Sequence, residues 1–186
     1  AKKILSSKIH LKGKVFVQNR ASGAVVEILD PKPNETILDV CAAPGTKSIY
    51  IFQKMNQSGN LFASDINSSQ VAKSFKYCNK LELLIDWKVK DATKDIFPMA
   101  DRILIDAPCT GTGVISRKPD IKWRKDIEDP DKMSAYQIKI LFHISKFLKT
   151  NGVIVYATCS MENQENWNVI ESFLNILIFP LISPNP

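Results

Sequence analysis

Short apolar runs alternate with amphipathic segments along most of this chain. Five runs have the length of buried strands, namely 36–40, 61–65, 87–90, 102–106 and 153–157, and a further short strand is expected at 15–18. Helical spacing of apolar residues predicts helices over 22–29, 46–55, 133–148 and 162–177, and Asn151 and Gly152 are expected to end the third of these. It predicts another helix with Ser68 as its N-cap and with Val71, Phe75, Cys78 and Glu82 on one face. Because strands that alternate with helices pair in parallel, the sequence predicts an α/β fold with a doubly wound, mostly parallel sheet.

Acidic residues stand at the ends of consecutive predicted strands. Asp65 ends the second of the five, Asp91 follows the third and Asp106 ends the fourth. The carboxyl ends of parallel strands meet at one edge of the sheet, where open α/β folds bind their ligands. Asp65 stands about 20 residues after Gly45, the spacing at which doubly wound folds place a carboxylate on ribose hydroxyls. One such residue could merely cap a turn, but three in register favour a ligand site.

The first predicted strand passes into its helix through a loop of small residues and a lysine: Cys41, Ala42, Ala43, Pro44, Gly45 and Lys47. Small residues let the backbone approach a ligand, and the N-terminus of the following helix offers N–H groups to an anionic or polar one. The GxxxxGK[ST] spacing of a P-loop is missing, and the loop has only one glycine of GxGxxG. A tight turn without a ligand is the alternative interpretation.

Two cysteines follow predicted strands in similar settings. Cys109 lies in Asp-Ala-Pro-Cys-Thr-Gly-Thr-Gly at 106–113, and Cys159 lies in Thr-Cys-Ser after the strand at 153–157. Such positions deliver side chains to the ligand-binding edge, which favours thiol chemistry. The alternative is that a cysteine is simply a small buried hydrophobe, and this is the favoured interpretation for Cys78 on the apolar face of its helix.

Composition and charge limit the classes of function. The 186 residues suffice for one domain, and 25 Lys and Arg against 19 Asp and Glu leave a net charge of +6, which weakly favours an anionic partner such as nucleic acid. The polar segment 107–131 is predicted to be one long loop, and long loops inside compact domains are usually functional or disordered. Its basic residues are candidate phosphate contacts: Arg117, Lys118, Lys122, Arg124 and Lys125.

The cysteine and histidine pattern excludes a metal centre. Four widely spaced cysteines and two histidines lack zinc-ligand spacing, so we expect no metal and reduced thiols. No apolar run is long enough to span a membrane, and no signal-peptide core is present. These features predict a cytoplasmic protein, expected to be a monomer, with a basic lead-in at 1–14 and one domain over 15–186.

Taken in order, these motifs resemble those of the S-adenosylmethionine-dependent RNA cytosine-C5 methyltransferases. The matching segments are 39–47, Asp65, Asp91, 106–113 and 156–160. The continuation over 113–123 is similar to the bacterial Sun (Fmu) branch, which modifies small-subunit ribosomal RNA. The resemblance implies a Rossmann-like class I methyltransferase domain over 15–186, lacking part of the C-terminal antiparallel hairpin of that fold.

The resemblance also implies a role for each matching residue. The segment from Cys41 to Gly45 would hold the methionine part of S-adenosylmethionine, Asp65 its ribose and Asp91 its adenine. Lys47 and Asp106 would lie near both the cofactor and the target base, and Asp106, protonated or hydrogen-bonding at N3 of the base, would act in catalysis by stabilising the adduct. Cys159 would attack C6 of cytosine as the nucleophile, and Cys109 would help to release the product.

The chain departs from the family pattern at two positions. Thr46 stands where a second glycine is common, and Asn19 replaces the acid of a Gln-acid pair that contacts RNA. The family's N-terminal RNA-binding region is also not in this sequence. Two other functions therefore stay open: a DNA cytosine-C5 methyltransferase, which would attack with Cys109, and a catalytically idle RNA-binding fragment.

Overall fold

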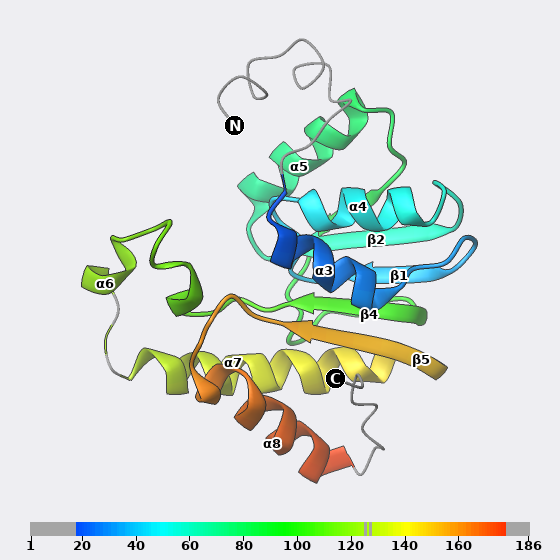
Figure 1. The fold of residues 1–186 in the computed structure, drawn as a ribbon. Coiled ribbons are helices and arrows are strands. Elements are labelled where there is room, and N and C mark those ends of the chain that lie inside the picture. Colours follow the sequence, from blue (N-terminus) through cyan, green and yellow to red (C-terminus); the bar gives the residue numbers. More distant parts are fainter. Residues whose placement is uncertain (1–17, 125, 127, 178–186) are drawn as a thin grey trace. The chain divides into compact units, whose positions relative to one another are not determined.

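The structure is a computed structural model that describes residues 18–124, 126 and 128–177 (Figure 1). Within this range the chain forms two compact units. The first comprises residues up to 106 together with 144–157, and the second comprises 107–143 and the residues from 158 on. The predicted strand at 15–18 and the predicted shortening of a C-terminal hairpin fall mainly on residues outside the described part.

The first unit contains a five-stranded parallel sheet in the order β3-β2-β1-β4-β5. Its strands are β1 (Thr36–Asp39), β2 (Asn60–Asp65), β3 (Asp86–Val89), β4 (Ala100–Asp106) and β5 (Leu148–Ala157). The chain moves outward from β1 to β3 and then crosses back to β4, so the strand order reverses beside β1. Ligands of doubly wound folds bind at this reversal. The predicted α/β fold with a mostly parallel sheet is confirmed.

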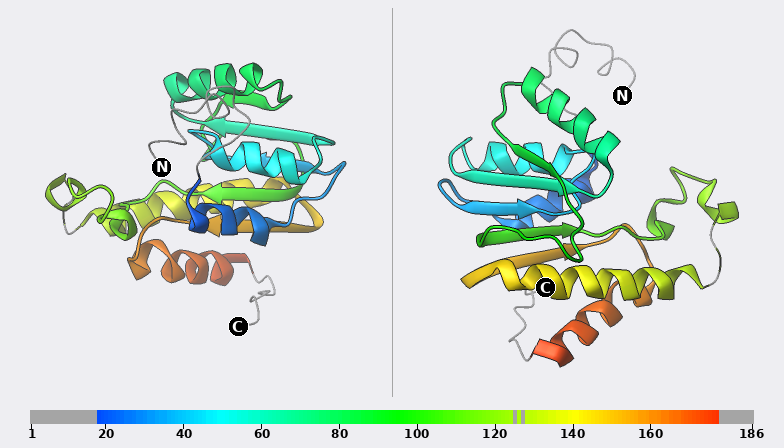
Figure 2. Two further views of the ribbon diagram at one scale, coloured as in Figure 1. Left: turned by 45° about the horizontal axis from the view of Figure 1, so that its top comes forward. Right: turned by 180° about the vertical axis from the view of Figure 1, so that it is seen from behind.

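Three helices of the first unit lie on one face of the sheet, α3 (Arg20–Leu29), α4 (Thr46–Lys54) and α5 (Ser68–Lys80) (Figure 2). Their apolar sides form one core cluster with the strand residues that point toward them. The cluster includes Leu29, Phe52 and Val71 from the helices and Ile37 and Leu104 from β1 and β4. This core fixes the start of α4 directly behind the loop that leaves β1.

Several local predictions differ from the structure. Asn67, and not Ser68, caps α5, because its side chain accepts the N–H of Gln70. Phe75, predicted on the apolar face of that helix, is 47% exposed. No helix joins β3 to β4, since residues 90–99 form turns and irregular backbone.

The second unit carries the segment that follows β4 and the segment that follows β5. Its elements are the 3-10 turn η1 (Thr112–Val114), α6 (Ile121–Arg124), α7 (Asp129–Ile144, with its last residue in the first unit), the 3-10 turn η3 (Asn163–Glu165) and α8 (Trp167–Leu177). The polar segment predicted as one long loop is therefore interrupted by η1 and α6. No helix in the described part of the chain is long and apolar enough to cross a bilayer.

Candidate functional site

The loop after β1 depends on the conformation of Gly45. This residue has φ 95°, and a Cβ atom there would lie 3.0 Å from the ring of Trp87. Its N–H donates to the carbonyl of Ala42 at 2.7 Å, which makes the turn tight. Gly45 also stands at the N-cap of α4 without a side-chain cap, so the first N–H groups of α4 face the loop. Glycine here supplies both the backbone conformation and the close approach.

Asp65 holds the same loop from the end of β2. Its Oδ2 accepts the N–H of Ala43 at 3.2 Å, and its Oδ1 accepts the N–H of Asn67 at 2.9 Å. A carboxylate with two oxygens at the strand edge still has acceptor capacity for ribose hydroxyl groups. Asp65 therefore lies beside the small-residue loop at the carboxyl end of β2.

Lys47 and Asp106 form an ion pair. The Nζ atom of Lys47 lies 2.5 Å from Oδ2 of Asp106, and the two side chains are 16% and 32% exposed. The pair links the first turn of α4 to the carboxyl end of β4. A half-buried pair at this edge offers one ammonium and one carboxylate to a polar ligand.

Asp39 is a residue whose importance the sequence did not reveal. It ends β1 and is completely buried, and its Oδ2 accepts the hydroxyl of Ser48 at 2.7 Å. Its Oδ1 has no hydrogen-bond partner among the described residues. Burial raises the pKa of Asp39 to about 7, against the smaller opposing effect of the Ser48 hydrogen bond. Asp39 is therefore a fully buried carboxyl group with one oxygen that has no partner among the described residues.

Asp91 and Cys41 complete this edge. Asp91 accepts the N–H and the hydroxyl of Thr93 at 2.9 and 2.6 Å, and these hydrogen bonds lower the pKa of Asp91. Burial, followed by the charges of nearby carboxylates that include Asp39 and Asp65, raises the pKa of Cys41, so this thiol stays protonated. Every predicted cofactor residue therefore lies in the first unit at or next to the carboxyl edge of its sheet.

The second unit brings Cys109 and Cys159 together. Their sulfur atoms are 3.1 Å apart, and the backbone N–H of Cys159 also donates to the sulfur of Cys109 at 3.3 Å. The two loops are further joined where the N–H of Gly113 donates to the carbonyl of Cys159 at 3.0 Å. Cys159 is exposed and Cys109 partly so, and neither forms a disulfide. Residues 50 positions apart in sequence thus form one pair of thiols.

The neighbouring thiol strongly affects the ionisation of Cys109. The hydrogen bond with Cys159, then burial, then the charge of Cys159 raise the pKa of Cys109 far above that of an ordinary thiol. The protonated Cys109 can donate its S–H to the sulfur of Cys159, which is the more exposed of the two.

The basic residues predicted to meet phosphates are only partly described. Arg117 and Lys118 follow η1 and are exposed. Lys125 lies outside the described residues, and for Lys122 and Arg124 only the backbone in α6 is described. Among the described residues no group of His, Cys, Asp and Glu side chains is arranged to hold a metal ion.

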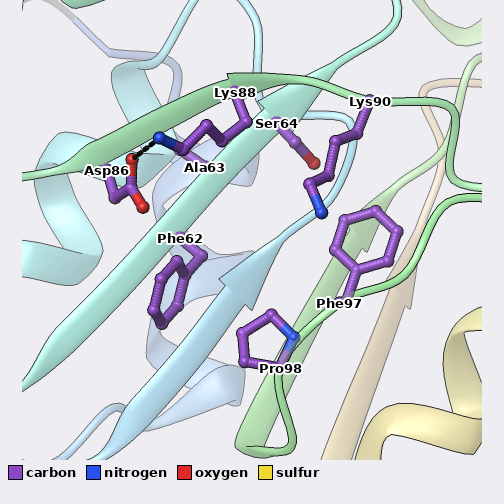
Figure 3. Close-up of a pocket in the computed structure, with 8 residues that line it drawn as sticks. All are labelled: Phe62, Ala63, Ser64, Asp86, Lys88, Lys90, Phe97 and Pro98. Carbon is purple, nitrogen blue, oxygen red and sulfur yellow. Dashed lines mark ion pairs between the residues drawn. The ribbon is translucent and has the colours of Figure 1, made fainter.

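A separate hollow of about 240 Å³ lies in the first unit over β2 and β3 (Figure 3). Its lining includes Phe62, Ser64, Lys88, Lys90 and Phe97, and the ammonium of Lys90 lies 4.7 Å from the centre of the Phe97 ring. None of the residues predicted for cofactor or catalysis lines this hollow, so it is distinct from the edge described above.

The parallel sheet with its reversal beside β1 and polar residues along its carboxyl edge defines a Rossmann-like class I methyltransferase fold. Residues 26–177 match the family described as 16S rRNA methyltransferase RsmB/F. The chain belongs to this family.

Curated relatives and solved structures agree with this assignment. The chain is 40% identical over 167 residues to the probable ribosomal RNA small subunit methyltransferase B of Bacillus subtilis (strain 168). The aligned region covers 87% of this chain and 37% of that protein. It also resembles the crystal structure of NSun6 from Pyrococcus horikoshii with SFG, with a TM-score of 0.85 and 28% identity over 92% of this chain and 45% of that one. A methyltransferase homolog protein from Pyrococcus horikoshii gives a TM-score of 0.81 at 31% identity, over 92% of this chain and 55% of that one. The chain thus spans about two fifths of the curated relative.

Proposed function

We propose that this chain transfers a methyl group from S-adenosylmethionine to C5 of a cytosine in RNA, and that the RNA is small-subunit ribosomal RNA. Membership of the RsmB/F family and the name of the Bacillus subtilis relative support the substrate class. The observation that carries the proposal is the pair of thiols, with the sulfur atoms of Cys109 and Cys159 3.1 Å apart.

A pair of thiols suits this reaction because C5 of cytosine is a weak nucleophile. A thiolate must first form a bond to C6, which makes C5 electron-rich. After methylation, the proton on C5 leaves and the electrons of that C–H bond restore the ring double bond, while the sulfur–C6 bond breaks. One sulfur is therefore needed as nucleophile, and a second group must accept the proton.

We assign the nucleophile to Cys159 and the proton acceptor to Cys109. An ordinary thiol has a pKa of about 8.5, so attack at neutral pH requires help for the thiolate. The protonated Cys109 can supply it, because its S–H can donate to the sulfur of Cys159. Once Cys159 is bound to carbon, its sulfur no longer accepts a hydrogen bond from Cys109 as a thiolate, and it no longer carries the charge that also raises the pKa of Cys109. Cys109 can then lose its proton to solvent, and the resulting thiolate can take up the proton that leaves C5.

The carboxyl edge of the sheet suits S-adenosylmethionine, which supplies the electrophilic methyl group. The small residues from Cys41 to Gly45 let backbone N–H and C=O groups meet it closely, and Asp65 offers acceptors to ribose hydroxyls. We further propose that Asp91 lies toward the adenine, and that Lys47 and Asp106 lie near the methionine part and the target base.

The proposal extends to the partner and its compartment. RNA bound through exposed basic residues such as Arg117 and Lys118 would be held largely by phosphate contacts, so its affinity should fall steeply with salt. Equal affinity at low and high salt would contradict a phosphate-dominated interface. A monomer in the cytoplasm, with no metal, is part of this proposal.

The experiment that tests the function is methyl transfer from labelled S-adenosylmethionine to small-subunit ribosomal RNA. Wild type, Cys159→Ser and Cys78→Ala are compared, because Cys78 is a buried helix residue with no role in the proposal. We expect label at C5 of cytosine with wild type and Cys78→Ala, and none with Cys159→Ser. Labelling by Cys159→Ser at the wild-type rate would refute the assignment, and no labelling by wild type would favour an idle RNA-binding fragment.

The DNA-methylating alternative predicts the opposite pattern. In that case Cys109 would attack, Cys109→Ser would lose the covalent adduct and Cys159→Ser would keep it. The greater exposure of Cys159 weighs against this alternative, since the attacking sulfur must reach the base.

A further inference from the structure

A buried carboxylate in the second unit holds the loop that carries Cys109. Glu165, the last residue of η3, has no exposed surface. Its Oε1 accepts the backbone N–H of Thr110 at 2.8 Å, and its Oε2 accepts the hydroxyl of the same residue. A carboxylate is costly to bury, so hydrogen bonds of this kind are needed to keep it there.

A buried amide on α7 holds the same loop from its other side. Gln137 is fully buried, and its Nε2 donates to the carbonyl of Pro108 at 2.9 Å and to Oε1 of Glu165 at 3.1 Å. The peptide groups on both sides of Cys109 are therefore fixed by one connected pair of side chains. The backbone of Cys109 has little freedom to shift while these bonds remain.

The next residue in the chain holds the loop that carries Cys159. Asn166 accepts the hydroxyl of Thr158 on its Oδ1 at 2.7 Å, and its Nδ2 donates to the carbonyl of Ser160 at 3.0 Å. These two partners are the residues directly before and after Cys159. Glu165 and Asn166 are adjacent, so two consecutive residues form hydrogen bonds with both loops that carry the cysteines.

We propose that Glu165 and Asn166 are positioning residues that fix the separation of the two thiols, Glu165 acting on Cys109 through Thr110 and Asn166 acting on Cys159 through Thr158 and Ser160. The inference rests on the proposed function for its catalytic consequence, but the geometry of the thiols can be tested without methyl transfer.

The two neighbours should affect different steps of the reaction. Loss of the Glu165 carboxylate misplaces Cys109, which slows product release more than it slows the attack by Cys159, so the covalent enzyme–RNA adduct accumulates. Loss of the Asn166 amide misplaces Cys159, so the adduct forms slowly. A misplacement near 1 Å can reduce a rate by about 100-fold, and we expect effects between about 10- and 100-fold.

The test compares Glu165→Gln and Asn166→Ala with wild type and with Glu171→Gln, an exposed acid on α8. Rates of adduct formation and of its breakdown are measured by rapid quenching and denaturing gels. We expect slow breakdown in the first variant, slow formation in the second and no change in the control. A general loss of folding would lower the rates of adduct formation and breakdown equally. Either that result or wild-type rates in both variants would overturn the proposal.

Thr110 provides a second pair of variants in case Glu165→Gln does not fold. Thr110→Val removes the hydroxyl that donates to Glu165, whereas Thr110→Ser keeps it. We expect slow adduct breakdown in the valine variant and rescue in the serine variant. Equal behaviour of the two would contradict the role assigned to Glu165.

A measurement on the thiols alone separates this inference from the proposed function. Diamide, a thiol oxidant, joins two nearby thiols as a disulfide and is itself reduced by the two electrons and two protons they release. We expect Cys109 and Cys159 to close at least about tenfold more slowly in Glu165→Gln than in wild type. Equal rates of disulfide formation in the two proteins would overturn the inference, whether or not wild type methylates RNA. A wild type that methylates no RNA would by itself contradict only the proposed function.

Discussion

Replacement of Gly45 by alanine should damage the cofactor loop in a measurable way. Gly45 has φ 95°, a conformation that costs an L-residue about 1–2 kcal/mol. The added Cβ would lie 3.0 and 3.1 Å from two ring carbons of Trp87, a buried side chain that cannot move freely. Such overpacking adds about 1 kcal/mol or more. The free energy of unfolding should therefore fall by about 3 kcal/mol.

The matched control is Gly23→Ala, within α3. The new Cβ would lie no closer than 3.9 Å to another side chain, that of Tyr50, and the backbone needs no positive φ. Alanine there should stabilise the helix by about 0.5–1 kcal/mol.

Thermal unfolding followed by circular dichroism measures both effects. For a chain of this size 1 kcal/mol corresponds to roughly 2–4 °C, so Gly45→Ala should lower Tm by about 6–12 °C while Gly23→Ala raises it slightly. Calorimetric titration should also show weaker S-adenosylmethionine binding by Gly45→Ala alone. Wild-type Tm and affinity in Gly45→Ala would refute the argument that this loop requires glycine.

Two further substitutions test the carboxyl edge of the sheet. Because the pKa of Asp39 is raised to about 7 when folded, the folded state keeps a proton that the unfolded state loses, and stability falls as pH rises from about 4 to 7. Asp39→Asn should remove this dependence of stability on pH. Above pH 7 the variant should be more stable than wild type by about 4 kcal/mol, as measured by urea unfolding. An unchanged pH dependence would contradict the raised pKa of Asp39. Lys47→Met removes the ion-pair partner of Asp106 and should slow methyl transfer by about 10- to 100-fold. The control is Lys54→Met, which removes an exposed ion pair with Glu27 and should keep the wild-type rate in the same assay. Equal rates in the two lysine variants would show that the Lys47 pair has no part in the reaction.

The sequence predicted the sheet and its carboxyl edge because both follow from local pattern. Alternating strands and helices imply parallel pairing, and parallel pairing alone places Asp65, Asp91 and Asp106 at one edge. The boundary between α7 and β5 was predicted less well. The predicted helix ran over 133–148, with Asn151 and Gly152 as its end signal, but α7 ends at Ile144 and β5 begins at Leu148. The pairing of β4 with β5 is irregular there, and a Cβ on Gly152 would lie 2.9 Å from the carbonyl oxygen of Asp101, so the glycine serves a close strand contact.

The residues that hold the site were not visible in the sequence. Glu165 contacts Thr110 across 55 positions and Gln137 contacts Pro108 across 29, and no local pattern encodes such contacts. Asp39 reads as an ordinary strand end until its burial and unused oxygen are known. The chemistry-bearing side chains thus follow from motif and strand position, whereas their supports depend on tertiary packing.

The central claim, that Cys159 attacks and Cys109 releases, is tested most directly by trapping the covalent intermediate. Cys109→Ser, Cys159→Ser and the double variant are incubated with S-adenosylmethionine and small-subunit ribosomal RNA, then separated on a denaturing gel. We predict an RNA adduct that accumulates with Cys109→Ser and is absent from both proteins that lack Cys159. An adduct that persists in Cys159→Ser and disappears in Cys109→Ser would contradict the claim and make Cys109 the nucleophile.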